Sequence, residues 1–143
     1  MIAYVDSSVV LRVVLRQPGA LREWRSIERA VASALVEVEC LRTLDRLRLR
    51  LGRSDRDLAH RREVVFDLLR TFEIVEIERP VLARAALPLP SILGTLDAIH
   101  LATAALWRDS QGEELVMATH DAELARGARA LGFQVVGLDP TPA

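Results

Sequence analysis

Four acidic side chains stand where carboxylates could converge and do chemistry. Asp6 follows an apolar strand in YVDSSVVLR (4–12), and Asp121 follows another in ATHDAEL (118–124). Asp97 falls in the first turn of an apolar helix, and Glu39 in the first turn of a long helix. Because the working site of an open α/β sheet lies outside the carboxyl ends of its strands, these four acids are expected at one rim.

Each acid also has an ordinary structural explanation. Asp6 and Asp121 suit helix N-caps, and Asp97 suits the positive end of a helix dipole. Glu39 suits an ion pair with Arg42, three residues further along the helix. Taken together, however, two carboxylates about 4–5 Å apart repel by roughly 3–4 kcal/mol at an effective dielectric near 20. Oxygen-only ligands favour Mg²⁺ or Mn²⁺ as the ion that relieves this repulsion, and such an ion suits phosphodiester hydrolysis by a metal-activated water.

The elements that must position these acids alternate between strands and helices. Strands are predicted at 2–5, 31–34, 73–78, 114–119 and 133–138, the third as a half-buried edge strand. Helices are predicted at 7–16, 20–29, 36–51, 55–71, 96–109 and 121–131, with a short one starting at Pro80. This order predicts a three-layer α/β/α sandwich with a central parallel sheet of four to five strands, in one domain over residues 1–143.

Local signals set the expected helix ends. Gly52 and Gly132 are predicted to end the helices before them. Ser54 and Thr95 are predicted as N-caps of the helices that follow. The helix containing LDAIHLATAALW is apolar on most sides, so it is expected to be deeply buried.

Composition narrows the function classes. All 19 basic residues are arginine, which excludes a Walker-type phosphate loop and lysine-based catalysis. Residues 42–62 carry eight arginines and three aspartates, and this run is either a solvated helix surface or a phosphate-binding rim. No apolar run is long enough to span a bilayer, and no basic leader precedes the first strand. Together with a single cysteine, Cys40, these features predict a cytoplasmic protein.

The chain resembles the PIN-domain nucleases, in particular the VapC-type toxins of bacterial toxin–antitoxin pairs. The resemblance rests on four pieces in family order and spacing, YVDSSVVLR, SALVEVECLRTL (33–44), TLDAIHLATA (95–104) and ATHDAEL. It implies that the catalytic acids are Asp6, Glu39, Asp97 and Asp121. It also places Ser8 and Thr119 on small polar positions near the metal, Arg42 on the arginine after the glutamate, and His120 on a variable position without a metal role.

The resemblance further implies an RNA-cutting enzyme that uses Mg²⁺ or Mn²⁺. Asp6, Asp97 and Asp121 would hold one ion, and Glu39 would complete that site or help hold a second. VapC-type members usually form homodimers, and a cognate antitoxin inserts a segment into the acidic groove. Contact with DNA is expected only through the antitoxin. Arginines of the basic run, among them Arg46, Arg50 and Arg53, would guide the RNA.

Other residues and functions are less favoured by the sequence. His100 is interpreted as a hydrogen-bonded core histidine rather than a general base, and Cys40 as a buried residue rather than a nucleophile. Glu37 is a weaker match than Glu39. A receiver-like signalling domain would need a lysine after a late strand, and a haloacid-dehalogenase-type phosphatase would need an aspartate at position 8, where the chain has serine. A PIN-like interaction domain without catalysis stays open as an alternative.

Overall fold

The computed structural model describes residues 1–138. Its strands are β1 (Ile2–Val5), β2 (Arg29–Ser33), β3 (Glu73–Val75), β4 (Val116–Ala118) and β5 (Val135–Val136). Its helices are α1 (Ser7–Val14), α2 (Leu35–Leu51), α3 (Asp55–Leu69), α4 (Arg79–Ala85), α5 (Thr95–Gln111) and α6 (Ala122–Ala130), with a 3₁₀ helix η1 (Arg22–Ser26) before β2. All four strand pairings are parallel, in the order β3-β2-β1-β4-β5.

The central strand β1 buries both of its faces, as a parallel strand between helix layers must. Ala3 and Val5 join an apolar cluster with residues of α1, α2 and α3. Tyr4 points to the opposite face, into a cluster with residues of α5 and α6. The predicted three-layer α/β/α sandwich with a parallel sheet of four to five strands is therefore confirmed, and β3 is an edge strand as expected.

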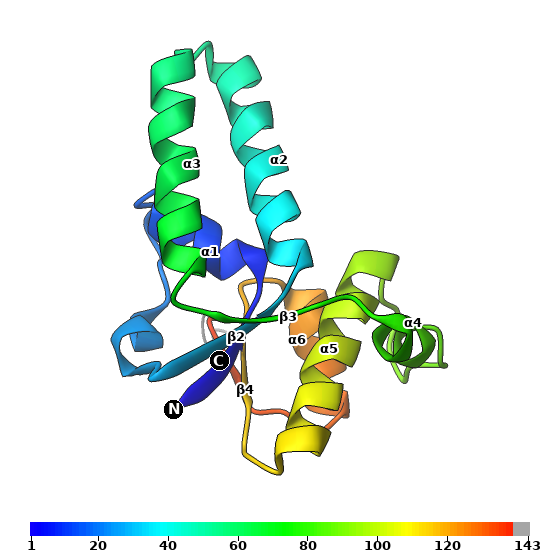
Figure 1. Ribbon diagram of the computed structural model, residues 1–143. Helices are drawn as coiled ribbons and strands as arrows, with labels where there is room; N and C mark the ends of the chain where they lie inside the picture. Colours follow the sequence, from blue (N-terminus) through cyan, green and yellow to red (C-terminus); the bar gives the residue numbers. More distant parts are fainter. Residues whose placement is uncertain (139–143) are drawn as a thin grey trace, which may run out of the picture.

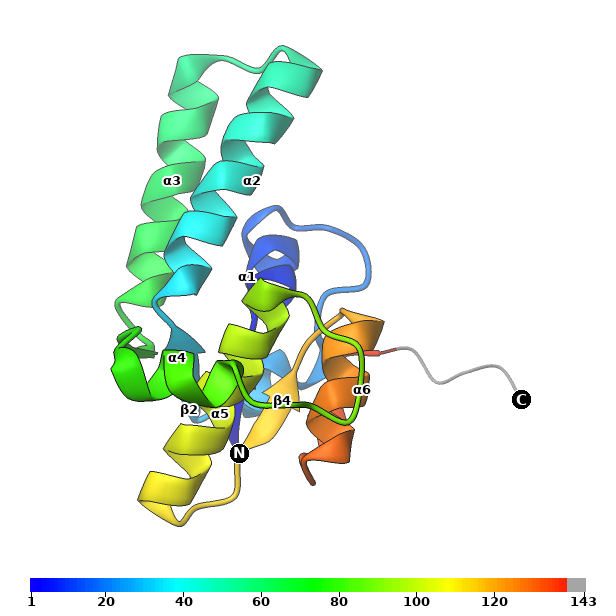
Figure 2. The same ribbon diagram turned by 90° about the vertical axis from the view of Figure 1, so that its right-hand side faces the viewer.

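Some helices pack along the sheet, and two of them project away from it. Figures 1 and 2 show α2 and α3 as a long hairpin that projects away from the sheet, while α5 and α6 lie beside it. Since α2 begins directly after β2, the hairpin leaves from the carboxyl ends of the strands. Among the helices of residues 1–138, none combines the length and apolar character that a bilayer crossing needs.

Several local signals are confirmed. Gly52 ends α2 in the left-handed conformation, with φ of 61°. Ser54 caps α3 through its side chain, which accepts a hydrogen bond from Asp57 N at 3.1 Å. The apolar helix α5 buries nine of its residues, including the run from Ala98 to Ala105.

Other predictions are wrong or too long. The predicted helix at 20–29 is replaced by the five-residue η1, because Arg29 already belongs to β2 and pairs in register with Ile2 of β1. Thr95 is the first residue of α5 rather than its N-cap, which is Gly94 without a side-chain bond. The strands predicted at 73–78, 114–119 and 133–138 are shorter than expected, at three, three and two residues. Sheet pairing, and not the extent of apolar sequence, sets these limits.

Gly137 holds the chain against the end of β4. It has φ of 107°, and a Cβ atom there would lie 2.4 Å from the carbonyl oxygen of Thr119. Gly52 also has a positive φ, but a Cβ atom there would meet no other atom within 4 Å. A substitution at Gly52 would therefore introduce backbone strain alone, whereas one at Gly137 would introduce both strain and a steric clash.

We expect Gly137→Ala to lower the free energy of unfolding by at least about 3 kcal/mol, because strain and clash with backbone add. Gly52→Ala, the control with strain alone, should cost about 1 kcal/mol. Urea unfolding followed by circular dichroism measures both. Equal losses for the two variants would contradict the close approach of Gly137 to Thr119.

Candidate active site at the carboxyl ends of the strands

Asp6 is the most enclosed of the four acids, with 5% of its surface exposed. It follows β1 and is the N-cap of α1, where its Oδ1 accepts hydrogen bonds from the backbone N–H groups of Ser8 (3.0 Å) and Val9 (3.3 Å). The Ser8 hydroxyl donates to the same oxygen at 2.5 Å. Burial nevertheless raises the pKa of Asp6, and these donors only partly oppose the increase. All of its donors are neutral, so its negative charge is solvated without being balanced.

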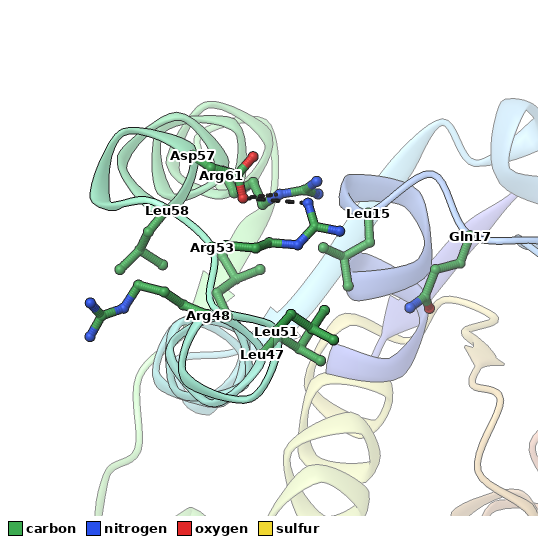
Figure 3. Close-up of a pocket in the computed structure, with 10 residues that line it drawn as sticks. Leu15, Gln17, Leu47, Arg48, Leu51, Arg53, Asp57, Leu58 and Arg61 are labelled. Atoms are coloured by element: carbon green, nitrogen blue, oxygen red, sulfur yellow. Dashed lines mark hydrogen bonds and ion pairs between the residues drawn. The ribbon is translucent and has the colours of Figure 1, made fainter.

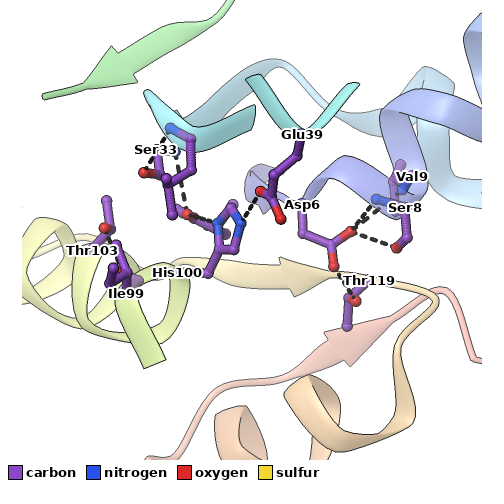
Figure 4. A network of polar contacts seen from close by, with 11 residues as sticks. Asp6, Ser8, Val9, Ser33, Glu39, Ile99, His100, Thr103 and Thr119 are labelled. Carbon is purple, nitrogen blue, oxygen red and sulfur yellow. Dashed lines mark hydrogen bonds and ion pairs between the residues drawn. The ribbon is translucent and has the colours of Figure 1, made fainter. Parts of the chain in front are cut away.

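Two hydroxyl groups join the end of β1 to the turn after β4. Thr119 donates to Asp6 Oδ2 at 2.6 Å and accepts the backbone N–H of Asp121 at 2.9 Å. Ser8 accepts the backbone N–H of His120 at 3.0 Å while its hydroxyl hydrogen goes to Asp6. Figure 4 shows Asp6 between these two hydroxyl side chains. The pair therefore fixes the position of Asp6 relative to Asp121.

Asp121 is the N-cap of α6, as its ordinary structural explanation suggested. Its Oδ1 accepts the backbone N–H groups of Glu123 (2.8 Å) and Leu124 (3.0 Å). Its side chain forms no ion pair within residues 1–138. Asp6 and Asp121 thus each cap a helix and also lie at the carboxyl end of a strand. Both are possible because β1 and β4 lead almost directly into α1 and α6.

The pKa of Asp97 depends on the charges of the other three acids. It lies in the first turn of α5 and is partly exposed, and within the described part of the chain it makes no ion pair. Its pKa is raised first by burial and then by the negative charge of Asp121, with smaller contributions from Asp6 and Glu39. His100 acts in the opposite direction. Asp121, Asp6 and Glu39 therefore lie near enough to Asp97 for their charges to act on its pKa.

Glu39 reaches the same region from one turn inside α2. Its Oε1 lies 2.5 Å from Nε2 of His100, which comes from α5 and is 1% exposed. The ion pair with Arg42, which was the ordinary structural explanation of Glu39, is absent, since Arg42 instead contacts Asp45 at 3.1 Å. His100 is buried and hydrogen-bonded as expected, but its partner is a residue of the candidate site.

The donor chemistry of this rim fits a hard divalent cation. The four acids offer only carboxylate oxygens, which Mg²⁺ and Mn²⁺ prefer. Asp6, Asp97 and Asp121 have no arginine partner among residues 1–138. Within that range, no three Asp, Glu, His or Cys side chains stand close enough to hold an ion as they lie.

Comparison with known proteins assigns the chain to a family. The PIN domain family model matches residues 3–130. The chain belongs to the PIN-domain family. Among curated relatives, Ribonuclease VapC46 of Mycobacterium tuberculosis strain ATCC 25618 / H37Rv is 36% identical over 136 residues, covering 93% of this chain and 95% of the relative. Ribonuclease VapC47 of strain CDC 1551 / Oshkosh is 31% identical over 137 residues, covering 91% and 92%.

Solved structures share the PIN fold. A toxin–antitoxin complex from Klebsiella pneumoniae contains a chain with a TM-score of 0.64 at 22% identity, covering 94% of this chain and 95% of that one. VapBC2 from Rickettsia felis, bound to a DNA fragment from its promoter, gives 0.61 at 12% identity, with coverages of 94% and 97%. At these identities the likeness shows the fold. Together with the curated relatives, the comparisons confirm the predicted VapC-type PIN domain.

The remaining predicted residues of this PIN domain lie at varying distances from the acids. Arg42 is exposed on α2 and directed to Asp45, so it does not support Glu39 directly. His120 has its Nδ1 2.6 Å from the carbonyl oxygen of Gly137, in keeping with a role outside the acidic set. Cys40 is buried, and burial raises the pKa of its thiol to about 12, which makes it a poor nucleophile at neutral pH.

A separate hollow of about 200 Å³ lies between the α2–α3 hairpin and the end of α1. Figure 3 shows Leu15, Leu47 and Leu51 along it, with Arg53 and Arg61 directed to Asp57. None of the four acids lines this hollow. It is thus a feature of the hairpin and separate from the acidic rim.

Sequence reasoning missed the link from Glu39 through His100 to Tyr4. Tyr4 Oη lies 2.6 Å from His100 Nδ1, on the side of the ring opposite Glu39. One signal was available, since Asp97 and His100 are three residues apart and so share a helix face. No local pattern indicated the two distant partners.

Replacing Asp97 tests the electrostatic environment of this site. In the folded protein the pKa of Asp97 is raised above its ordinary value of 3.8, so ionising it costs stability as pH rises from about 4 through the raised value. In chelator, Asp97→Asn should therefore leave Tm unchanged or raise it by up to about 4 °C at pH 7, since solvent screens a partly exposed group and about 1 kcal/mol shifts Tm by that amount.

The difference in Tm between Asp97→Asn and the wild type should shrink as pH is lowered toward 4. Added Mg²⁺ should raise the Tm of the wild type more than that of the variant. Differential scanning calorimetry across this pH range, with Asp67→Asn on the exposed surface of α3 as control, measures the difference. A large loss of Tm for Asp97→Asn in chelator would mean that this carboxylate is mainly structural.

Proposed function

We propose that this protein is a Mg²⁺- or Mn²⁺-dependent endoribonuclease, the toxin of a type II toxin–antitoxin module, that hydrolyses RNA phosphodiester bonds at a four-carboxylate site. The observation that carries the proposal is that Ser8 and Thr119 tie Asp6 to the turn of Asp121 at the carboxyl ends of β1 and β4, within a PIN domain. Its curated relatives named Ribonuclease VapC46 and VapC47 support the reaction class. We also propose that residues 1–143 form a single PIN domain.

In this proposal the acids hold the ion and α1 and α6 shape its surroundings. Asp6, Asp97 and Asp121 are the ligands, partly through water, and Glu39 completes the set or helps hold a second ion. The chemistry that a divalent ion supplies when bound is Lewis acidity toward water and phosphate oxygens. The N-terminal ends of α1 and α6, next to Asp6 and Asp121, add positive potential where negative charge develops.

An arginine stripe on α2 gives the RNA backbone a path to the acids. Arg46 and Arg50 follow Glu39 by seven and eleven residues, which is nearly two and three helical turns, so they lie on the same face. At 1.5 Å per residue they stand about 10 and 16 Å from Glu39 along the helix. Both are exposed, and Arg50 makes no ion pair within the described residues. Arg53 lies past α2 and contacts Asp57 at 3.6 Å, so its charge is partly committed.

Partner proteins are part of the same proposal. Structural neighbours from Klebsiella pneumoniae, Rickettsia felis and Haemophilus influenzae were solved in toxin–antitoxin assemblies, which supports a cognate antitoxin that covers the acidic rim here. DNA would then be contacted only through the antitoxin. Exposed apolar side chains concentrate in residues 82–96, which supports a homodimer. These side chains are Leu82, Leu87, Ile92 and Leu96.

Asp6→Asn tests the metal assignment. Without this ligand, cleavage of total RNA in Mg²⁺ should fall by more than about 100-fold, the upper end of the loss seen when a residue that only supports a ligand is removed. Circular dichroism should stay native, and EDTA should abolish wild-type cleavage. Asp67→Asn, at a surface site on α3, should cut RNA normally. An active and folded Asp6→Asn protein would refute the site.

The arginine stripe is tested by its salt dependence. On the Asp6→Asn background, replacing Arg46 and Arg50 with alanine should weaken binding of single-stranded RNA and reduce the slope of log Kd against log salt by about 1.4, because two phosphate contacts are lost. Fluorescence anisotropy measures both quantities. The control pair Arg25→Ala and Arg70→Ala removes the same charge before the amino ends of β2 and β3. Equal slopes for the two pairs would show that the stripe does not contact RNA.

A further inference from the structure

His100 connects the buried core of the domain to the acidic rim. Its ring lies between two partners from other elements, Glu39 of α2 at 2.5 Å from Nε2 and Tyr4 of β1 at 2.6 Å from Nδ1. Both His100 and Tyr4 are buried, with 1% and 0% of their surface exposed. A side chain enclosed in this way cannot rotate freely, so it can transmit a fixed position from the sheet to Glu39.

Counting donors and acceptors gives the direction of the hydrogen bonds. Tyr4 Oη accepts the backbone N–H of Ser33 at 3.2 Å, so its own hydrogen is available for the imidazole. Tyr4 then donates to Nδ1, and since a carboxylate oxygen only accepts, Nε2 carries the hydrogen that His100 donates to Glu39.

Glu39 needs such a partner more than the aspartates do. Asp6 and Asp121 are short side chains fixed by backbone N–H groups at helix starts. Glu39 lies inside α2, its side chain is longer, and its carboxylate has no hydrogen-bond partner among residues 1–138 other than His100. Holding Oε1 by the imidazole removes most of the rotational freedom of the carboxylate and leaves Oε2 for a ligand.

We propose that His100, oriented by Tyr4, is the positioning residue of Glu39 and presents its free carboxylate oxygen to a divalent ion. The inference rests on the proposed function, because it assigns Glu39 to the metal site. It assigns His100 no contact with RNA or with the ion. The same role is familiar for groups behind metal ligands, whose loss typically costs about 10–100-fold in metal affinity or activity.

The test combines calorimetry with Mn²⁺ and nitrogen NMR of the metal-free protein. His100→Leu should weaken Mn²⁺ binding by about 10–100-fold, while His100→Gln, which keeps an N–H donor, should stay within about threefold of wild type. The ¹⁵N spectrum of the wild-type imidazole should show hydrogen on Nε2 only. His60→Gln and His120→Gln assign the other two histidine signals, and the exposed His60→Gln should leave Mn²⁺ binding unchanged.

Tyr4→Phe keeps the inference testable if His100→Leu does not fold. Losing the phenol should move part of the ring hydrogen from Nε2 to Nδ1 and weaken Mn²⁺ binding less than His100→Leu. Hydrogen on Nδ1 in the wild type would overturn the inference, as would a Mn²⁺ affinity within twofold of wild type for a folded His100→Leu or for Tyr4→Phe. If the wild type itself takes up no Mn²⁺, the proposed function fails as well, which distinguishes the two outcomes.

Discussion

The concentration of negative charge at the carboxyl ends of β1, β2 and β4 is the constraint on which the site depends. The protein tolerates it with neutral donors: two backbone N–H groups and two hydroxyls around Asp6, and two backbone N–H groups at Asp121. These bonds solvate the carboxylates but do not cancel their charge, and the pKa values of Asp6 and Asp97 remain raised. Helix N-termini favour carboxylate caps, so capping explains Asp6 and Asp121, but Asp97 makes no side-chain cap and its pKa is raised by burial and by the charge of Asp121.

Topology explains why the acids meet. The strand order β3-β2-β1-β4-β5 places the first strand at the centre, and the chain builds the sheet outward on one side and then on the other. The carboxyl ends of β1 and β4 therefore form the topological switch point, where crevices open in α/β sheets. Ser8 and Thr119 bridge this junction with hydroxyl groups, so the two small side chains determine how far apart Asp6 and Asp121 stand.

The sequence was informative wherever structure follows from local chemistry or from strand alternation. The parallel sheet, the end of α2 at Gly52 and the cap at Ser54 were predicted because each depends on nearby residues. The helix expected at 20–29 fails because Arg29 gains more from pairing beside Ile2 in the sheet than from helix propensity, which is weak for any short segment. Likewise an ion pair with Arg42 does not explain Glu39, since Arg42 contacts Asp45 one turn ahead and His100 reaches Glu39 from another helix.

His100 shows why a division into core and site residues is unsafe in this fold. It has the burial of a core residue, and the sequence around it is apolar, so its interpretation as a core histidine was correct but incomplete. The same helix α5 carries Asp97 at the rim and, one turn later, the imidazole that holds Glu39. A helix packed this tightly cannot shift without moving both groups. The apolar contacts of α5 with the sheet therefore fix the distance between two acids of the candidate site, although none of those contacts touches a charged atom.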